Sequence, residues 1–108
     1  MSNYSRIIAG TMHWGIWGKN FSLVDMSLRI RHCLELGLTT FDHADIYGNY
    51  ENESDFGAAF VESGISRSDV QLISKCGIQM TQERKNQVKH YQYDADYIIW
   101  SAEQSLQK

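Results

Sequence analysis

The sequence predicts an α/β fold built on a parallel sheet. Short apolar runs bounded by glycine or polar residues alternate three times with stretches of helical periodicity. No internal repeat or low-complexity tract competes with this order. Successive strand–helix units pair their strands in parallel through right-handed crossovers. Because about 100 to 150 residues is the commonest domain size, we expect residues 1–108 to belong to one domain.

The first unit is expected from an apolar run at residues 6–12, which leads into glycine-rich sequence. A helix should then begin at Ser22, which resembles a capping residue because Asp25 follows three positions later, and end at Gly37. Its buried side would be formed by residues at helical spacing, namely Met26, Ile30, Cys33 and Leu34.

The second unit is expected from the apolar run 38–41, which leads directly into Asp42. Acidic residues at 51, 53 and 55 then mark the start of a helix with Phe56 and Phe60 on one face and Gly64 at its end. The run 38–41 starts directly after Gly37, and such a short connection from a helix to the next strand is typical of parallel sheets.

The third unit is expected from turn residues at 66–69 followed by a strand at 70–74. The polar stretch 79–93 is longer than most connections in compact domains, which indicates a functional loop with some local structure. Asp94 can cap a final helix. The apolar side of this helix would consist of Ile98, Ile99, Ala102 and Leu106.

Composition excludes several classes of protein. Hydrophobic residues make up 43% and charged residues 21% of the chain, as in ordinary globular proteins. A net charge of −3 and a pI near 5.7 give no attraction to nucleic acid or to anionic membranes. No secretory signal or long apolar segment is present, so we expect a cytoplasmic protein that does not enter a membrane. Cys33 and Cys76 are expected to be reduced thiols.

Candidate chemistry lies at the predicted strand ends, where ligands and catalytic groups gather in parallel α/β folds. Asp42 and Tyr47 follow the second strand, and Lys75 follows the third. A phenol with an ordinary pKa near 10 is a useful proton donor and acceptor near neutrality only if a positive charge stabilises its phenolate, which Lys75 can supply. Each residue taken alone also has a structural alternative. An acid at a strand end is more often a salt-bridge partner or helix cap, a tyrosine more often packs its ring, and a lysine is usually solvated.

The segment 42–48, which reads Asp-His-Ala-Asp-Ile-Tyr-Gly, resembles the Asp-x-Ala-x-x-Tyr-Gly segment of the aldo-keto reductases. The segment 73–75, Ile-Ser-Lys, resembles the third-strand lysine of that family. Further likeness lies at 10–12, 35–37 and 101–106, so the resemblance covers essentially the whole chain. Within the family the chain is most similar to a bacterial oxidoreductase branch, the YdhF-like proteins.

The resemblance implies a (β/α)8 TIM barrel, of which this chain would hold the amino-terminal three β/α units. It also implies transfer of a hydride from NADPH to an aldehyde or ketone, a small-molecule carbonyl substrate. Tyr47 would then donate the proton, Lys75 would tune the phenol, and Asp42 would pair with Lys75. Cofactor binding is implied for Gly10, Thr11, Met12 and Asp42. Substrate binding is implied for Tyr47 and for Trp14, with Trp17 nearby, although both tryptophans have the alternative of being core aromatics.

The family's fourth catalytic residue, a histidine after a fourth strand, would fall beyond Lys108, as would the contacts to the cofactor phosphates. The four histidines of this chain are at the wrong places to substitute for it. His43, beside Asp45, is expected to make local hydrogen bonds, and no metal site is expected. We therefore expect the 108-residue piece to be inactive by itself. The rival hypothesis is a non-catalytic remnant or interaction module that self-associates through exposed sheet edges.

Overall fold

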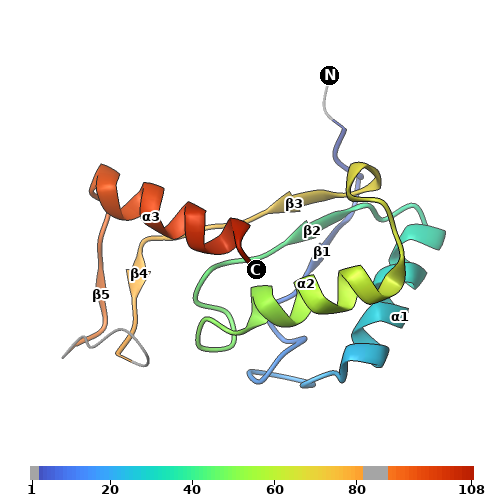
Figure 1. The fold of residues 1–108 in the computed structure, drawn as a ribbon, viewed down its shortest axis with the longest axis horizontal. Coiled ribbons are helices and arrows are strands. Elements are labelled where there is room, and N and C mark those ends of the chain that lie inside the picture. Colours follow the sequence, from blue (N-terminus) through green and yellow to red (C-terminus); the bar gives the residue numbers. More distant parts are fainter. Residues whose placement is uncertain (1–2, 82–87) are drawn as a thin grey trace.

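A computed structural model of the chain describes residues 3–81 and 88–108. Its centre is a parallel three-stranded sheet in the order β1-β2-β3, and Figure 1 shows helices α1 and α2 in the connections between these strands. The bounds are β1 (Ile8–Gly10), α1 (Leu23–Glu35), β2 (Thr40–Asp42), α2 (Asn52–Ser63) and β3 (Gln71–Ile73). The predicted parallel α/β fold is confirmed.

Helix α1 has both of the predicted ends. The Ser22 hydroxyl accepts a hydrogen bond from the backbone N–H of Asp25 at 3.1 Å, which satisfies one of the free donors in the first turn. Gly37 follows the helix with a φ of 81°, a conformation that glycine adopts without a steric penalty. The sequence therefore determines where this helix starts and stops through local chemistry.

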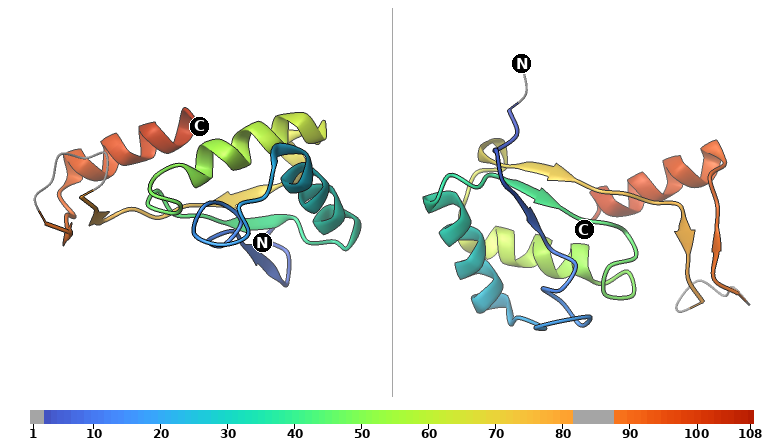
Figure 2. Two further views of the ribbon diagram at one scale, coloured as in Figure 1. Left: turned by 90° about the horizontal axis from the view of Figure 1, so that it is seen from below. Right: turned by 180° about the vertical axis from the view of Figure 1, so that it is seen from behind.

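Helices α1 and α2 cover the same face of the sheet, as Figure 2 shows. The core between them contains Met26 and Ile30 from α1, Phe41 from β2, and Phe56 from α2. The rings of Phe41 and Phe56 lie 5.3 Å apart between centroids. The buried faces predicted for both helices are confirmed, because the other predicted members are partly buried against this core: Cys33, Leu34 and Phe60.

The polar stretch after β3 carries local structure, as predicted. It contains a two-stranded antiparallel ladder of β4 (Ile78–Gln79) and β5 (His90–Tyr91). Residues 82–87 of this stretch lie outside the described residues. The turn predicted before β3 is a short 3-10 helix, η1 (Arg67–Asp69).

Helix α3 (Ala95–Leu106) begins as predicted, with the Asp94 carboxylate accepting from the backbone N–H of Tyr97 at 3.1 Å. The face on which it packs was predicted wrongly. Its buried residues are Tyr97 and Ser101, whereas the predicted apolar side is exposed: Ile98 at 42%, Ile99 at 57% and Leu106 at 86%. The physical reason is that α3 docks through hydroxyl groups on carboxylates, which leaves the apolar stripe exposed.

The helices of the described residues are short. Helix α1 has 13 residues, and α2 and α3 have 12 each. Over residues 3–81 and 88–108, no helix combines the length and the apolar character needed to cross a membrane.

Candidate active site

The carboxyl ends of β2 and β3 bring Asp42 and Lys75 together. Asp42 is the last residue of β2 and is in register with Ile73, the last residue of β3. The Lys75 ammonium therefore reaches the Asp42 carboxylate, with 2.6 Å between Nζ and Oδ1. The same ammonium donates to the backbone carbonyl of His43 at 2.7 Å. A salt bridge and a main-chain hydrogen bond together fix the position of the amine.

The parallel ladder continues past the ends of both strands. The backbone N–H of His43 donates to the carbonyl of Ile73 at 2.7 Å, and that of Asp45 donates to the carbonyl of Lys75 at 3.0 Å. These bonds hold the backbone of Lys75 beside the segment that carries Asp42. The spacing between the acid and the amine is thus set mainly by the sheet.

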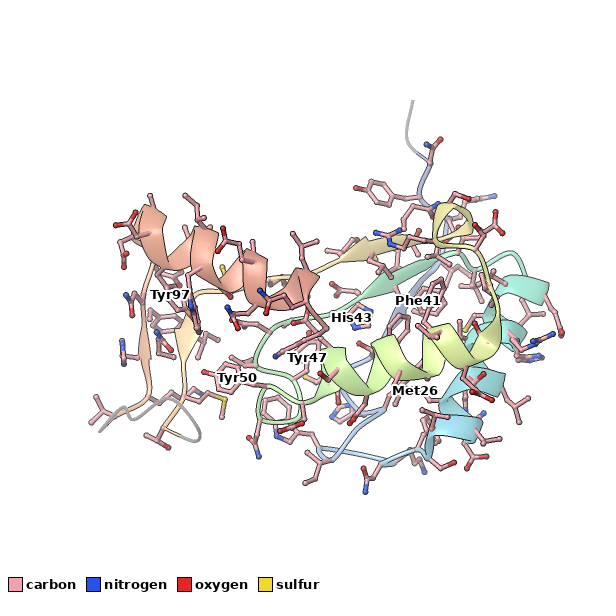
Figure 3. The ribbon with its side chains drawn as sticks, in the orientation of Figure 1. Met26, Phe41, His43, Tyr47, Tyr50 and Tyr97 are labelled. Carbon is pink, nitrogen blue, oxygen red and sulfur yellow. The ribbon has the colours of Figure 1, made fainter. Side chains whose placement is uncertain are left out.

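Tyr47 lies on the turn that follows this ladder, beyond the end of β2 (Figure 3). The Lys75 Nζ is 5.3 Å from the centroid of the Tyr47 ring. The acid, the amine and the phenol predicted from the strand ends therefore lie in one cluster, with the amine between the other two.

The electrostatics of this cluster centre on Lys75. Burial lowers the pKa of Lys75, but its hydrogen bond to Asp42 and its contact with Tyr47 outweigh burial and raise this pKa above the usual value. The ammonium therefore stays charged near neutrality. The side chains of Lys75 and Asp42 are 48% and 36% exposed, so solvent screens part of the field that the amine exerts on its neighbours.

His43 lies under the cluster, against α2, and is 4% exposed. Its Nδ1 is 2.9 Å from the Thr11 hydroxyl, and its ring packs edge-on against Phe56 at 4.3 Å between centroids. Burial lowers the pKa of His43 to about 4, despite the opposing charges of Glu53 and Asp42. This neutral imidazole makes a hydrogen bond, as predicted, but its partner is Thr11, 32 residues away, and not a neighbour in the sequence. Within the described ranges no three potential ligands gather as a metal site.

Thr11 requires a correction. It was predicted on the cofactor side, but its side chain is 1% exposed and its hydroxyl donates to the Asp42 carbonyl at 3.0 Å. Its own carbonyl accepts from the Asn52 amide at 2.8 Å, and its N–H donates to the Asp42 carbonyl at 3.2 Å. Every polar group of Thr11 is used inside the protein, so Thr11 shapes the end of β1 and offers no polar atom to a ligand.

The two tryptophans occupy different environments. Trp14 packs against the core, with its ring 6.2 Å from those of both Phe21 and Phe41 between centroids, so its structural alternative holds in this chain. Trp17 lies beside the cluster, 6.2 Å from the Tyr47 ring, and its indole N–H donates to the side-chain oxygen of Asn49 at 3.2 Å. Trp17 is therefore an aromatic neighbour of Tyr47, whereas the partly buried Trp14 packs its ring against the core.

Sequence reasoning missed two buried polar residues beside this cluster. Asn52 is 2% exposed and contacts the end of β1, and Asp45 is 4% exposed and accepts from the Ser101 hydroxyl at 2.8 Å. Their partners lie 41 and 56 residues away in the sequence, so no local spacing pattern reveals them. The available signal was a polar residue just after a predicted strand end for Asp45, and a polar residue at the start of the predicted second helix for Asn52.

Comparison with known proteins gives a consistent result. Residues 6–108 match the sequence model of the aldo/keto reductase family. Oxidoreductase YdhF of Escherichia coli (strain K12) is 43% identical over 103 residues, which are 95% of this chain and 34% of that protein. The 6-dehydroglucose reductase of Agrobacterium fabrum is 36% identical over 104 residues, which are 94% of this chain and 35% of that protein.

A solved structure shows the same fold. A crystal structure from Pseudomonas aeruginosa, described as that of an aldo-keto reductase, superposes with a TM-score of 0.73 at 20% identity and covers 93% of this chain and 35% of that one. The chain thus has the arrangement of three β/α units of a TIM barrel, and it spans about a third of the length of the curated relatives it matches. The chain belongs to the aldo/keto reductase family.

Proposed function

We propose that residues 1–108 form the amino-terminal part of a single reductase domain that reduces aldehydes or ketones with NADPH. The observation that carries this proposal is the cluster in which Lys75 contacts the Asp42 carboxylate at 2.6 Å and lies 5.3 Å from the Tyr47 ring. A phenol beside a charged amine is suited to donating a proton to a developing alkoxide.

Reduction of a carbonyl needs a hydride for carbon and a proton for oxygen. When bound, NADPH supplies the hydride. In this proposal Tyr47 donates the proton, and the positive charge of Lys75 stabilises the phenolate that Tyr47 leaves behind. Asp42 holds the ammonium in place and keeps it charged.

The end of β1 is accessible within the described part of the chain. A methyl group built on Gly10 would meet no other atom within 4 Å, and the Met12 side chain is 39% exposed. Asp42 is the neighbour of Gly10 in the strand register. We propose that Gly10, Met12 and Asp42 form the cofactor side on this chain and that Trp17 borders the substrate. The names of two relatives, an oxidoreductase and a reductase, support the reaction class.

The test is a chimera in which this chain replaces the matching third of the YdhF protein. We expect the chimera to oxidise NADPH when given an aldehyde, and Tyr47→Phe to abolish most of that activity because the proton donor is gone. Tyr4→Phe, at a tyrosine that is 57% exposed before β1, is the matched control and should retain activity. Unchanged activity in Tyr47→Phe would show that another group donates the proton.

The alternative function, a non-catalytic module that self-associates, is favoured by a specific observation. Strands β1 and β3 are the edges of the three-stranded sheet. Apolar side chains near the β3 edge and on α3 are exposed, including Leu72 at 39% and Leu106 at 86%. Edges and patches of this kind promote pairing with another chain.

A further inference from the structure

Three consecutive residues after Tyr47 have left-handed backbone conformations. Gly48, Asn49 and Tyr50 have φ values of 62°, 55° and 71°. Glycine and asparagine tolerate this region, but a bulky residue such as tyrosine does so only when its surroundings hold it there. The conformation of Tyr50 in the turn that follows Tyr47 is therefore not favoured by its own side chain and depends on contacts from outside.

Two of these contacts are made by Asn49 and Tyr50. The Asn49 side-chain oxygen accepts from the Trp17 indole at 3.2 Å. The Tyr50 ring is 6% exposed, and its hydroxyl accepts from the backbone N–H of Met80 at 2.8 Å. These bonds attach the turn to the loop after β1 and to the segment after β4.

The third contact is Asn52, the first residue of α2. Its amide group donates to the carbonyl of Thr11 at 2.8 Å, and its backbone N–H donates to the carbonyl of Tyr47 at 3.1 Å. One residue therefore bonds both to the end of β1 and to Tyr47 itself.

The Asn52 side chain fits its site because two neighbours have no side chain. A Cβ built on Gly48 would lie 2.8 Å from the Asn52 Oδ1, and one built on Gly15 would overlap the same oxygen. This oxygen has no hydrogen-bond partner within the described part of the chain. Turning the amide over would place that oxygen against the Thr11 carbonyl, acceptor against acceptor, so the observed orientation is the one that makes a bond.

We propose that Asn52 is a positioning residue that fixes Tyr47 relative to the end of β1. The inference rests on the proposed function, because the end of β1 carries the cofactor side in that proposal. A single buried amide then sets the separation between the proton donor and the place where the hydride arrives. Asn52 acts through Tyr47 and touches no substrate.

The geometric part is tested by NMR in the YdhF chimera. The Trp17 and Tyr47 rings, 6.2 Å apart, and the Phe41 and Phe56 rings, 5.3 Å apart, provide two sets of inter-ring proton contacts. We expect Asn52→Ala to weaken the first set and to leave the second unchanged. Loss of both sets would indicate a general structural role and overturn the proposal, as would retention of both.

Two further variants keep the test decisive if Asn52→Ala is poorly folded. Gly15→Ala leaves Asn52 intact but pushes on its amide, so it should weaken the same Trp17 contacts. Ser54→Ala, at an exposed position two residues along α2, is the control and should change neither set of contacts.

The catalytic part is tested in the YdhF chimera. We expect Asn52→Ala to lower kcat by about ten- to a hundredfold with little change in the KM for NADPH, because small misplacements of reacting groups have effects of that size. Ser54→Ala should not change kcat. An active chimera whose kcat is unaffected by Asn52→Ala overturns this inference alone, whereas an inactive unmutated chimera overturns the proposed function.

Discussion

His43 is a residue whose burial has a measurable consequence. A neutral imidazole fits between Thr11 and Phe56, but an imidazolium there would lose its hydration, which is why the pKa of His43 falls to about 4. Unfolding returns this side chain to water and to its ordinary pKa of 6.5. Between these two values the unfolded state binds the additional proton, so the folded state loses stability as the pH falls.

We therefore predict that the free energy of unfolding decreases from pH 6.5 to pH 4 and that His43 contributes roughly 3 kcal/mol of this decrease. Above pH 6.5 its contribution is complete and constant. Urea titrations across this range should show a shallower pH dependence for His43→Asn than for the unmutated chain. His13→Gln, at an exposed histidine, is the control. An equally steep dependence in His43→Asn would assign the effect to other groups.

The residues of the candidate site differ in how far the sequence could predict them. Asp42 and Lys75 follow apolar runs that form neighbouring parallel strands, so their contact follows from strand order. Asn52 could not be found in this way, because its role depends on space left by Gly15 and on the carbonyl of Thr11, just after β1. Such roles arise from three-dimensional packing and leave no periodic pattern.

Helix α3 is attached to the rest of the chain by hydroxyl–carboxylate hydrogen bonds. The Ser101 hydroxyl donates to Asp45 at 2.8 Å in a buried position, and the Ser105 hydroxyl, one turn later, donates to Glu53 at 2.8 Å. Glu53 also accepts from the Ser74 hydroxyl at 2.7 Å. The two carboxylates thus link α3 to the segment that carries Tyr47 and to the end of β3.

We predict that Ser101→Ala destabilises the chain by about 1 to 3 kcal/mol, because the buried Asp45 carboxylate loses a donor. Ser105→Ala should cost less, since this contact is only partly buried. Chemical denaturation gives the free energies, and amide hydrogen exchange along residues 95–106 shows whether α3 detaches first. Equal stability of Ser101→Ala and the unmutated chain would contradict this account of docking.

Helices α1 and α3 show which features of a helix the sequence predicts and which it does not. Capping by Ser22 and Asp94 is local chemistry, and both helix starts were predicted correctly. The inward face of α1 was also correct, because its apolar stripe meets Phe41. For α3 the most apolar side was taken as the buried one, but the available docking surface presents carboxylates, so the serine side packs.

At the scale of the whole molecule the chain is less compact than its length implies. The radius of gyration is 14.4 Å, compared with about 13 Å expected for a compact domain of this length. Figure 1 shows α3 and the β4–β5 ladder extending away from the three-stranded sheet. An apolar-lined groove of about 380 Å³ runs between α3 and the end of β3, bordered by Cys76, Ile98 and Leu106.

We predict that the 108-residue chain alone self-associates and does not oxidise NADPH in the presence of an aldehyde. Sedimentation velocity should show a mass that rises with concentration, because sheet edges and apolar side chains are uncovered. Leu72→Lys, at β3, should reduce the association, and Val24→Lys, at an exposed position on α1, should not. A compact monomer at all concentrations would refute the predicted self-association. Aldehyde-dependent NADPH oxidation would refute the predicted inactivity.

The hydrogen bond from the Asp45 N–H to the Lys75 carbonyl has a consequence for biosynthesis. A polypeptide leaves the ribosome from its amino terminus, and its early segments fold first. All the contacts that join Asp42 to Lys75 lie within residues 1–75. This pair can therefore assemble as soon as the third strand has left the exit tunnel. The Asp42–Lys75 pair can then form before the later segments fold, and those segments can pack beside it.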